Sequence, residues 1–372
     1  MEQQNNNTIQ INHSDLTWFI QHIALNSQRA LMIHGLPGIG KSGGTDSLAK
    51  SIANSFNLKF SKEVAEDVED EIKYYTLSDA RASSLEPPDI RGLPYILAGG
   101  IRYALPKWLP KNPKSKGILF LDEMNLAPRE VQSACYQLIL DRRCGEYKLP
   151  DGWIIISAGN DASTCQTSAM EFSDPLNNRF VHLELLSPTA DEWCEWAIKN
   201  DVVPDVIGFH KFSQTNLTKL PDGKGHFTFP TPRTWEFVSD QIKLLPDNYT
   251  EHQLRMCVCS AVGVAVGNNF VAFQKLKNQL NLEDLFEHPE KVKDIKGLDV
   301  RWSLISAVVS KYKSDKKLLP KILKLCEYLE PEFAIQTLKF LHEYGKNKFL
   351  DDGVKCKEWK VLSDKYLKFI VN

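Results

Sequence analysis

Eight consecutive residues have the types and the spacing that bind phosphate. They read Gly35-Leu36-Pro37-Gly38-Ile39-Gly40-Lys41-Ser42, which fits the P-loop pattern G-x-x-x-x-G-K-S. In this pattern backbone N–H groups surround the β-phosphate, the lysine reaches the β- and γ-phosphates, and the serine hydroxyl binds Mg²⁺. The residues predicted to hold a nucleoside triphosphate are Gly35, Pro37, Gly38, Ile39, Gly40, Lys41, Ser42 and Gly43. Ser42 is also a predicted metal ligand.

The sequence on either side of this loop predicts the strand and the helix that must position it. Residues 30–34 are a short apolar run, as expected of a buried parallel strand. After Lys41, apolar residues recur at roughly helical spacing from Leu48 to Phe56. A strand, a glycine loop and a helix start in this order place phosphate at the positive end of a helix dipole.

A second apolar run, residues 117–121, ends in Asp122-Glu123. A carboxylate at the end of a buried strand near the P-loop can hold Mg²⁺ through water, and the next carboxylate can orient the attacking water. We therefore predict that Asp122 binds the metal and that Glu123 acts on the water. This pair predicts hydrolysis as well as binding.

Three further polar side chains are candidates for neutralising charge during phosphoryl transfer. A third apolar run, residues 153–157, leads to Asn160, whose amide could bond the water or the γ-phosphate, or could serve as a turn former. Arg179 follows Asn177-Asn178, and Arg233 lies within Pro230-Thr231-Pro232-Arg233-Thr234-Trp235. Taken alone, each arginine would be assigned to the solvated surface.

In this order and at these separations, the motifs resemble those of the AAA+ ATPases, and within them the MoxR-like, dynein-related branch. The signs are Asp-Ile-Arg-Gly-Leu-Pro at 89–94, Leu-Asp-Glu-Met-Asn-Leu-Ala-Pro at 121–128 and Phe-Pro-Thr-Pro-Arg-Thr-Trp at 229–235. The resemblance covers roughly residues 15–310. It implies an α/β fold, namely a P-loop NTPase αβα sandwich with a parallel sheet, followed by a mainly helical lid domain.

The resemblance also implies roles for the site residues. ATP and Mg²⁺ would be the cofactors, Glu123 the catalytic carboxylate and Asn160 the sensor 1 residue. Arg179 would be an arginine finger donated to the ATP of a neighbouring subunit, and Arg233 would be sensor 2, reaching from the lid. A finger in trans is worth ~10³–10⁵ in rate. Arg142 and Arg143, near the end of the helix after Asp122-Glu123, are rivals for the finger role.

Three segments are expected along the chain. Residues 1–187 would form the nucleotide-binding domain, 188–310 the lid with sensor 2, and 311–372 a lysine-rich helical extension. Within the first domain, residues 79–116 are rich in Pro and Gly, and so long a connection is usually functional or disordered. Candidates there for contacts with a client, or alternatively for packing on their own domain, are Ile96, Tyr103, Trp108 and Leu109.

Composition argues against several classes of protein. The 372 residues carry 45 Lys and Arg against 47 Asp and Glu, a net charge of −2, which predicts no bulk attraction to nucleic acid or to an anionic membrane. Apolar runs fall far short of the ~20 residues that span a bilayer, and the start lacks a signal-peptide pattern. Eight scattered cysteines without a C-x-x-C pair indicate reduced thiols, and a cytoplasmic location is expected.

The sequence thus favours an ATP-hydrolysing ring, by resemblance a homo-hexamer, that remodels or matures a client protein. A von Willebrand A-type partner is an expectation from the resemblance alone. The alternative is a nucleotide-dependent scaffold or switch, for example a component of a defence or stress operon. The preference for adenine over guanine remains open at this stage, because base contacts in such folds come largely from backbone and apolar side chains.

Overall fold

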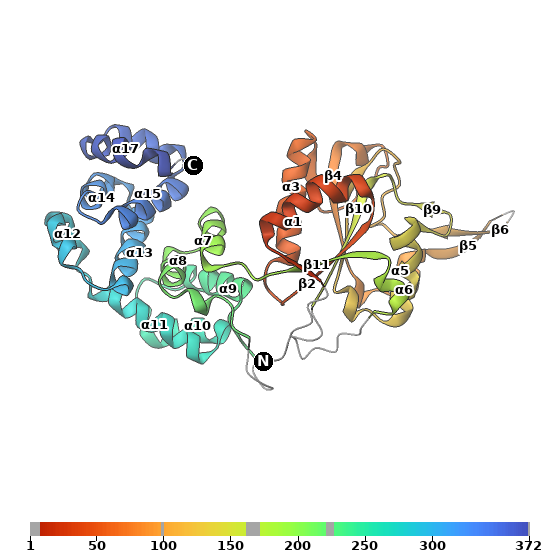
Figure 1. The fold of residues 1–372 in the computed structure, drawn as a ribbon, viewed down its shortest axis with the longest axis horizontal. Coiled ribbons are helices and arrows are strands. Elements are labelled where there is room, and N and C mark those ends of the chain that lie inside the picture. The colour runs from red at the N-terminus through yellow and green to blue at the C-terminus, as the bar shows by residue number, and fades with distance from the viewer. Residues whose placement is uncertain (1–7, 98–99, 161–171, 221–226, 371–372) are drawn as a thin grey trace. The chain divides into compact units, whose positions relative to one another are not determined.

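The computed structural model describes residues 8–97, 100–160, 172–220 and 227–370, without the side chains of residues 278 and 347. The chain divides into two compact units, Met1–Ser187 and Pro188–Asn372 (Figure 1). The first unit contains a parallel sheet covered by helices, and the second is built from helices. This is the predicted class, an α/β P-loop fold followed by a helical region.

A seven-stranded sheet, counted over the described residues, forms the centre of the first unit. Its strands are β1 (Ile9–Ile11), β2 (Ala30–Gly35), β3 (Lys59–Ser61), β4 (Tyr74–Arg81), β7 (Lys116–Asp122), β10 (Gly152–Asn160) and β11 (Phe180–Leu185). Their order across the sheet is β1-β11-β2-β10-β7-β4-β3, and every pairing is parallel. The P-loop strand β2 and the acidic strand β7 are therefore both neighbours of β10.

Helices cover both faces of this sheet, which explains why its central strands are apolar at nearly every position. Leu31 and Ile33 pack in one core with side chains of the first helices, and Met32 packs in a second core with Leu138 of α5. The helices of this unit are α1 (His13–Phe19), the π-helix η1 (Ile20–Ala24), α2 (Leu25–Ser27), α3 (Lys41–Ser55), α4 (Pro87–Arg91), α5 (Arg129–Asp141) and α6 (Asp174–Asn177), with 3₁₀ turns η2 (Asp70–Lys73), η3 (Ala82–Ser84) and η4 (Met124–Leu126).

The Pro- and Gly-rich segment 79–116 contains an antiparallel hairpin of β5 (Leu93–Leu97) and β6 (Gly100–Ala104). The hairpin side chains are exposed on both faces, and Ile96 is 86% exposed. Leu109, in contrast, is fully buried, and Trp108 donates from its indole N–H to the carbonyl of Asp89. The described part of the segment thus contains both of the environments that its composition left open. A second, shorter hairpin pairs β8 (Arg143–Cys144) with β9 (Tyr147–Lys148).

All regular secondary structure among the described residues of the second unit is helical. Its elements are α7 (Ala190–Lys199), α8 (Pro204–Phe212), η5 (Gln214–Asn216), α9 (Pro232–Lys243), α10 (Glu251–Val262), α11 (Val264–Gln279), α12 (Leu282–Glu287), η6 (Pro289–Asp294), α13 (Leu298–Ser314), η7 (Lys316–Leu318), α14 (Leu319–Cys326), α15 (Pro331–Gly345), α16 (Asn347–Val354) and α17 (Lys357–Ile370). One apolar core includes Trp235, Phe270 and Phe340. The segment after residue 310 therefore shares a core with the helices before it.

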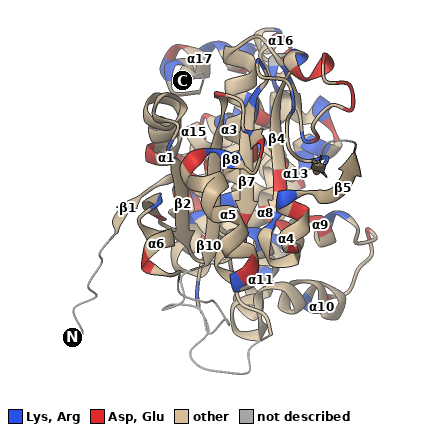
Figure 2. Cartoon of the chain, turned by 90° about the vertical axis from the view of Figure 1, so that its right-hand side faces the viewer, with Lys and Arg blue, Asp and Glu red and all other residues tan. Residues whose placement is uncertain are grey.

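The character of the helices and the distribution of charge both bear on possible partners. Within the described residues, none of the helices combines the length and the apolar character needed to cross a membrane. Figure 2 shows Lys and Arg interspersed with Asp and Glu along the elements rather than collected by sign. This mixture agrees with the near-neutral net charge.

The packing of β7 predicts a stability effect. A Cβ added at Gly117 would lie 2.2 Å from the carbonyl oxygen of Thr76 on β4 and 2.9 Å from the Trp153 ring on β10. Gly117→Ala is therefore expected to lower the free energy of unfolding by about 1–3 kcal/mol or more, measured by urea denaturation. Gly43→Ala is the matched control, because a Cβ there meets nothing within 4 Å and alanine favours the helix. Equal stability of the two variants would contradict this packing.

Candidate functional site

The P-loop lies between the carboxyl end of β2 and the first turn of α3. Gly38 and Gly40 have φ angles of +75° and +98°, in the left-handed region that favours glycine. Helix α3 begins at Lys41, immediately after Gly40. The loop thus has the backbone shape in which successive N–H groups face a common centre at a helix N-terminus.

Lys41 is nearly buried within this loop. Its ammonium group donates to the carbonyl oxygens of Gly35 and Leu36, at 2.8 Å each, and to Oδ1 of Asn160 at 2.9 Å. The predicted phosphate-binding lysine and the predicted sensor 1 asparagine are therefore in direct contact. This contact follows from the register, because Asn160 pairs with Gly35 across β10 and β2.

Ser42 and Asp122 also meet, with the serine hydroxyl donating to the aspartate carboxylate at 2.8 Å. Mg²⁺ in nucleotide sites is held by one or two protein oxygens together with phosphates and water, so this pair fits that ion. Among the described residues there is no cluster of three or more His, Cys, Asp or Glu with metal-binding geometry. The Ser42 hydroxyl and the Asp122 carboxylate are oxygen donors of the kind that Mg²⁺ takes alongside phosphates.

The surroundings of Asp122 favour a cation as well. Asp79 lies on the neighbouring strand β4, and burial together with the negative charge of Asp122 raises the pKa of Asp79, against the smaller opposing effects of Arg81 and Lys62. Burial is the larger of the two causes, and the charge of Asp122 adds to it. A divalent ion bound at Asp122 would offset this repulsion.

Glu123 has an unusual backbone conformation for its residue type. Its φ of +56° places it in the left-handed region, which is uncommon outside Gly, Asn and Asp. Its backbone N–H donates to Asp122 Oδ1 at 2.9 Å, and its carboxylate accepts a hydrogen bond of 2.5 Å from the Ser83 hydroxyl. Strained backbone of this kind concentrates at functional sites. Ser83 fixes where the carboxylate points.

Ser83 was not identified from the sequence. It follows β4 by two residues, in the turn η3, and the acidic pair follows β7. β4 and β7 are adjacent, with Arg81 paired with Asp122, so the register brings Ser83 to Glu123. The signal available in the sequence was a serine two residues beyond β4, and it is weak without the pairing of β4 with β7.

A second asparagine, Asn125, contacts the backbone of Asn160. The Asn125 side-chain amide donates to the backbone carbonyl of Asn160 at 2.5 Å. A Cβ at Gly159 would lie 2.6 Å from Asn125 Oδ1, so only glycine leaves room for this contact. Asn125, which stands within the motif at 121–128, therefore fixes the end of β10 beside the P-loop.

Arg179 is not part of this cluster. It immediately precedes β11, whose first residue, Phe180, pairs with Ala30 at the start of β2, whereas the P-loop follows the end of β2. Five residues of strand separate the two edges, roughly 16 Å. The Arg179 guanidinium lies 5.0 Å from the Tyr136 ring centre and donates to the carbonyl of Pro175 at 2.5 Å.

The two rival arginines have different environments. Arg142 is 8% exposed, and its guanidinium donates to the carbonyls of Pro150 and Trp153 at 2.8 and 2.7 Å. It therefore connects the end of α5 to the start of β10 within its own chain. Arg143 is exposed on β8. Arg233 belongs to the second unit, where its side chain is exposed in the first turn of α9.

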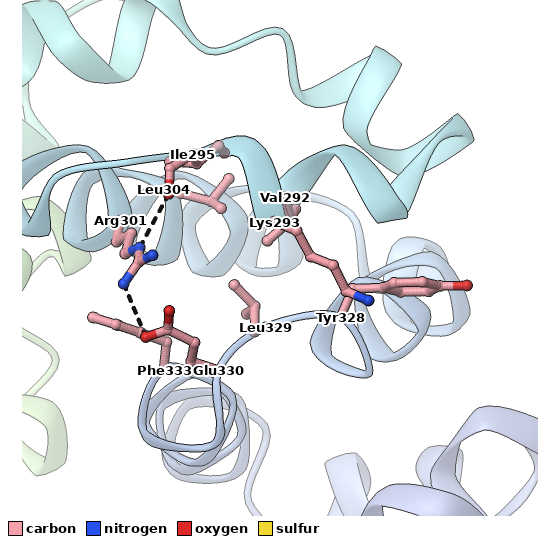
Figure 3. Close-up of a pocket in the computed structure, with 9 residues that line it drawn as sticks. All are labelled: Val292, Lys293, Ile295, Arg301, Leu304, Tyr328, Leu329, Glu330 and Phe333. Carbon is pink, nitrogen blue, oxygen red and sulfur yellow. Dashed lines mark hydrogen bonds and ion pairs between the residues drawn. The ribbon is translucent and has the colours of Figure 1, made fainter.

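A small pocket in the second unit contains two cationic side chains (Figure 3). It measures about 90 Å³ and lies between η6, α13 and the turn leading into α15. Arg301 pairs with Glu330 at 2.9 Å and also donates to the carbonyl of Ile295, while Lys293 lies over the Tyr328 ring. Because Arg301 is already committed to partners in the chain, this pocket is a packing feature of the helices.

Comparison with solved structures finds likenesses of low identity. NtrX from Brucella abortus is 16% identical, with a TM-score of 0.34, over 96% of this chain and 67% of that one. A RuvB mutant from Thermotoga maritima is 14% identical, with a TM-score of 0.33, over 96% and 87%. Hsp104 with ATPγS and casein is 16% identical, with a TM-score of 0.34, over 73% and 44%. No protein-family model and no curated protein matches the chain. Likenesses at these identities and TM-scores carry no conclusion about activity or assembly.

The position of Lys41 leads to a binding prediction. Lys41→Ala is expected to weaken binding of a fluorescent ATP analogue by about 10²-fold or more, because a charge-assisted contact to phosphate is lost. Lys50→Ala is the matched control, since Lys50 lies on the same helix and pairs with Asp46 at the surface. Unchanged affinity in Lys41→Ala would refute the phosphate-binding role of the loop.

Proposed function

We propose that this protein is an ATP-hydrolysing AAA+ module of the MoxR type that works as a homo-hexameric ring. Each nucleotide would lie on the P-loop of one subunit, and an arginine of the neighbouring subunit would complete the site. The work done with this hydrolysis would be the remodelling of a client protein. The motif order in the sequence and the arrangement of the site both support this proposal.

The distance of Arg179 from the other predicted site residues is the main support for this proposal. Arg179 lies at one edge of the sheet, roughly 16 Å along the strands from the other edge. At that other edge, strand ends and loops bring together Lys41, Ser42, Asp122, Glu123 and Asn160. An arginine at that distance cannot reach the γ-phosphate on its own P-loop. A subunit packed against the Arg179 edge would bring its own nucleotide to Arg179.

The chain's own residues have separable tasks in this reaction. Lys41 would bind the β- and γ-phosphates, and Ser42 with Asp122 would hold Mg²⁺, which neutralises phosphate charge. Glu123 would orient the attacking water and accept its proton, and Asn160 would bond the water or the γ-phosphate. Arg179 from the next subunit would stabilise charge that develops on the transferred group. Arg233 of the helical unit would act as sensor 2 on the same nucleotide.

The β5–β6 hairpin is the best candidate for contact with a client. Its apolar side chains, among them Leu93, Ile96 and Ile101, are exposed on both faces of the two-stranded ribbon. Exposed apolar residues gathered on one hairpin favour an interaction surface. A von Willebrand A-type protein remains a proposed partner on the resemblance alone, and adenine over guanine is likewise a proposal.

The arginine assignment is tested by substitution and mixing. Arg179→Ala is expected to bind ATP normally and to release phosphate ~10³–10⁵ more slowly, because transition-state charge is left unneutralised. Glu123→Gln is expected to bind ATP and hold it, because an amide accepts no proton. Mixing the two inactive proteins should restore phosphate release, since a mixed interface pairs an intact Glu123 with an intact Arg179.

The matched control is Arg143→Ala, which removes an exposed arginine from the same domain. Its phosphate release should stay within about twofold of the unmodified protein, as for other surface substitutions. If Arg143→Ala is slow and Arg179→Ala is not, the finger belongs to Arg143. Absence of rescue at every mixing ratio counts against any arginine acting in trans.

A further inference from the structure

Two half-buried histidines connect the P-loop strand to the segment that carries Arg179. His34 is the residue before Gly35 on β2, and His182 lies on the adjacent strand β11. His34 Nε2 and His182 Nδ1 are 2.8 Å apart, and His182 Nε2 lies 2.9 Å from the backbone carbonyl of Asn177, the last residue of α6. Two hydrogen bonds thus lead from the carboxyl end of β2 to the residues before β11. We call His34, His182 and these two bonds the histidine relay.

The backbone carbonyl fixes the direction of one of these two bonds. A backbone carbonyl only accepts, so His182 Nε2 must carry the proton and donate to Asn177. When His182 is uncharged, its Nδ1 is an acceptor and His34 Nε2 donates to it. In that form the order of donation is His34 to His182 to the Asn177 carbonyl. Replacing either ring by an apolar group breaks it.

Each end of this relay lies close in sequence to a residue of the proposed reaction. At one end, the carbonyl of Gly35, the residue after His34, accepts from Lys41. At the other end, Asn177 stands two residues before Arg179, whose backbone N–H donates to the carbonyl of Leu176. His182 also meets the ring of Phe180 edge-on, with ring centres 6.1 Å apart. The relay therefore reaches the short turn from which Arg179 projects.

We propose that His34 and His182 are positioning residues that hold the Arg179 turn in place for the neighbouring subunit's nucleotide. This inference rests on the proposed function. The Arg179 side chain contacts two parts of its own chain, the Pro175 carbonyl in α6 and the Tyr136 ring on α5. The histidine relay adds a side-chain link from the Arg179 turn to the carboxyl end of β2. A displacement of about 1 Å in a catalytic group costs up to ~10² in rate.

The test uses two subunit types that are inactive alone. The donor carries Glu123→Gln and supplies Arg179, and the acceptor carries Arg179→Ala and supplies Glu123. His182→Phe, which keeps an aromatic ring beside Phe180, is placed either in the donor or in the acceptor, and phosphate release by the mixture is measured. We expect a loss of about tenfold or more with His182→Phe in the donor. In the acceptor, whose finger is already removed, the change should stay within about twofold.

A conservative variant separates the hydrogen bond from packing. The side-chain amide of His34→Gln can still donate to His182, whereas His34→Leu cannot. In the donor, His34→Gln should keep most of the restored activity, and His34→Leu should lose as much as His182→Phe. The donor with both His34→Leu and His182→Phe should be no slower than either alone, because the two residues act as one unit. ATP affinity of each variant is measured to establish that it folds.

The outcomes distinguish the two proposals. If the unmodified donor and acceptor restore no activity, the finger in trans fails, and the relay fails with it. If they restore activity but His182→Phe has no effect, or the same effect in either subunit, only the relay is overturned. A residue that merely stabilises the domain would weaken both placements, and a positioning residue weakens only the donor.

Discussion

The parallel register of the central sheet is the constraint on which the rest of the site depends. Because every strand of the sheet runs the same way, the residues that follow β2, β7 and β10 come together at one edge. β10 lies between the P-loop strand and the acidic strand, so Asn160 reaches Lys41, and Ser42 reaches Asp122. The same register places the residue before β11 at the opposite edge. One geometric rule thus assembles the binding site and separates Arg179 from it.

Buried polar groups make this arrangement specific. The Lys41 ammonium, the Asn125 amide and the Ser83 hydroxyl each donate to an oxygen supplied by a different strand or loop. A buried donor left without an acceptor costs about 1–3 kcal/mol, so a shift in register would be penalised at several positions together. Glu123 adds a strained backbone at the point where water would be activated. Hydrogen bonds from these three donors hold the site around one strained residue.

The apolar runs at 30–34, 117–121 and 153–157 predicted strands, and these are the buried strands β2, β7 and β10. A strand buried on both faces needs apolar residues at every position, so this signal is local and readable. Ser83 and the His34–His182 pair could not be found in the same way. Their importance arises from the pairing of β4 with β7 and of β2 with β11, which links residues 40 and 148 positions apart. The environments of Trp108 and Leu109 could not be predicted either, because composition alone did not distinguish these two residues from the exposed Ile96. The roles of the site residues remain predictions.

The central claim is that hydrolysis requires an arginine from a second subunit. The most direct measurement is particle mass with Mg²⁺ and a slowly hydrolysed ATP analogue, against no nucleotide, together with phosphate release over a range of protein concentrations. The account predicts a nucleotide-dependent assembly of about six subunits and a specific activity that rises with concentration, because a site completed in trans needs a neighbour. A monomer whose specific activity is independent of concentration would contradict it and would make Arg179 an ordinary surface residue.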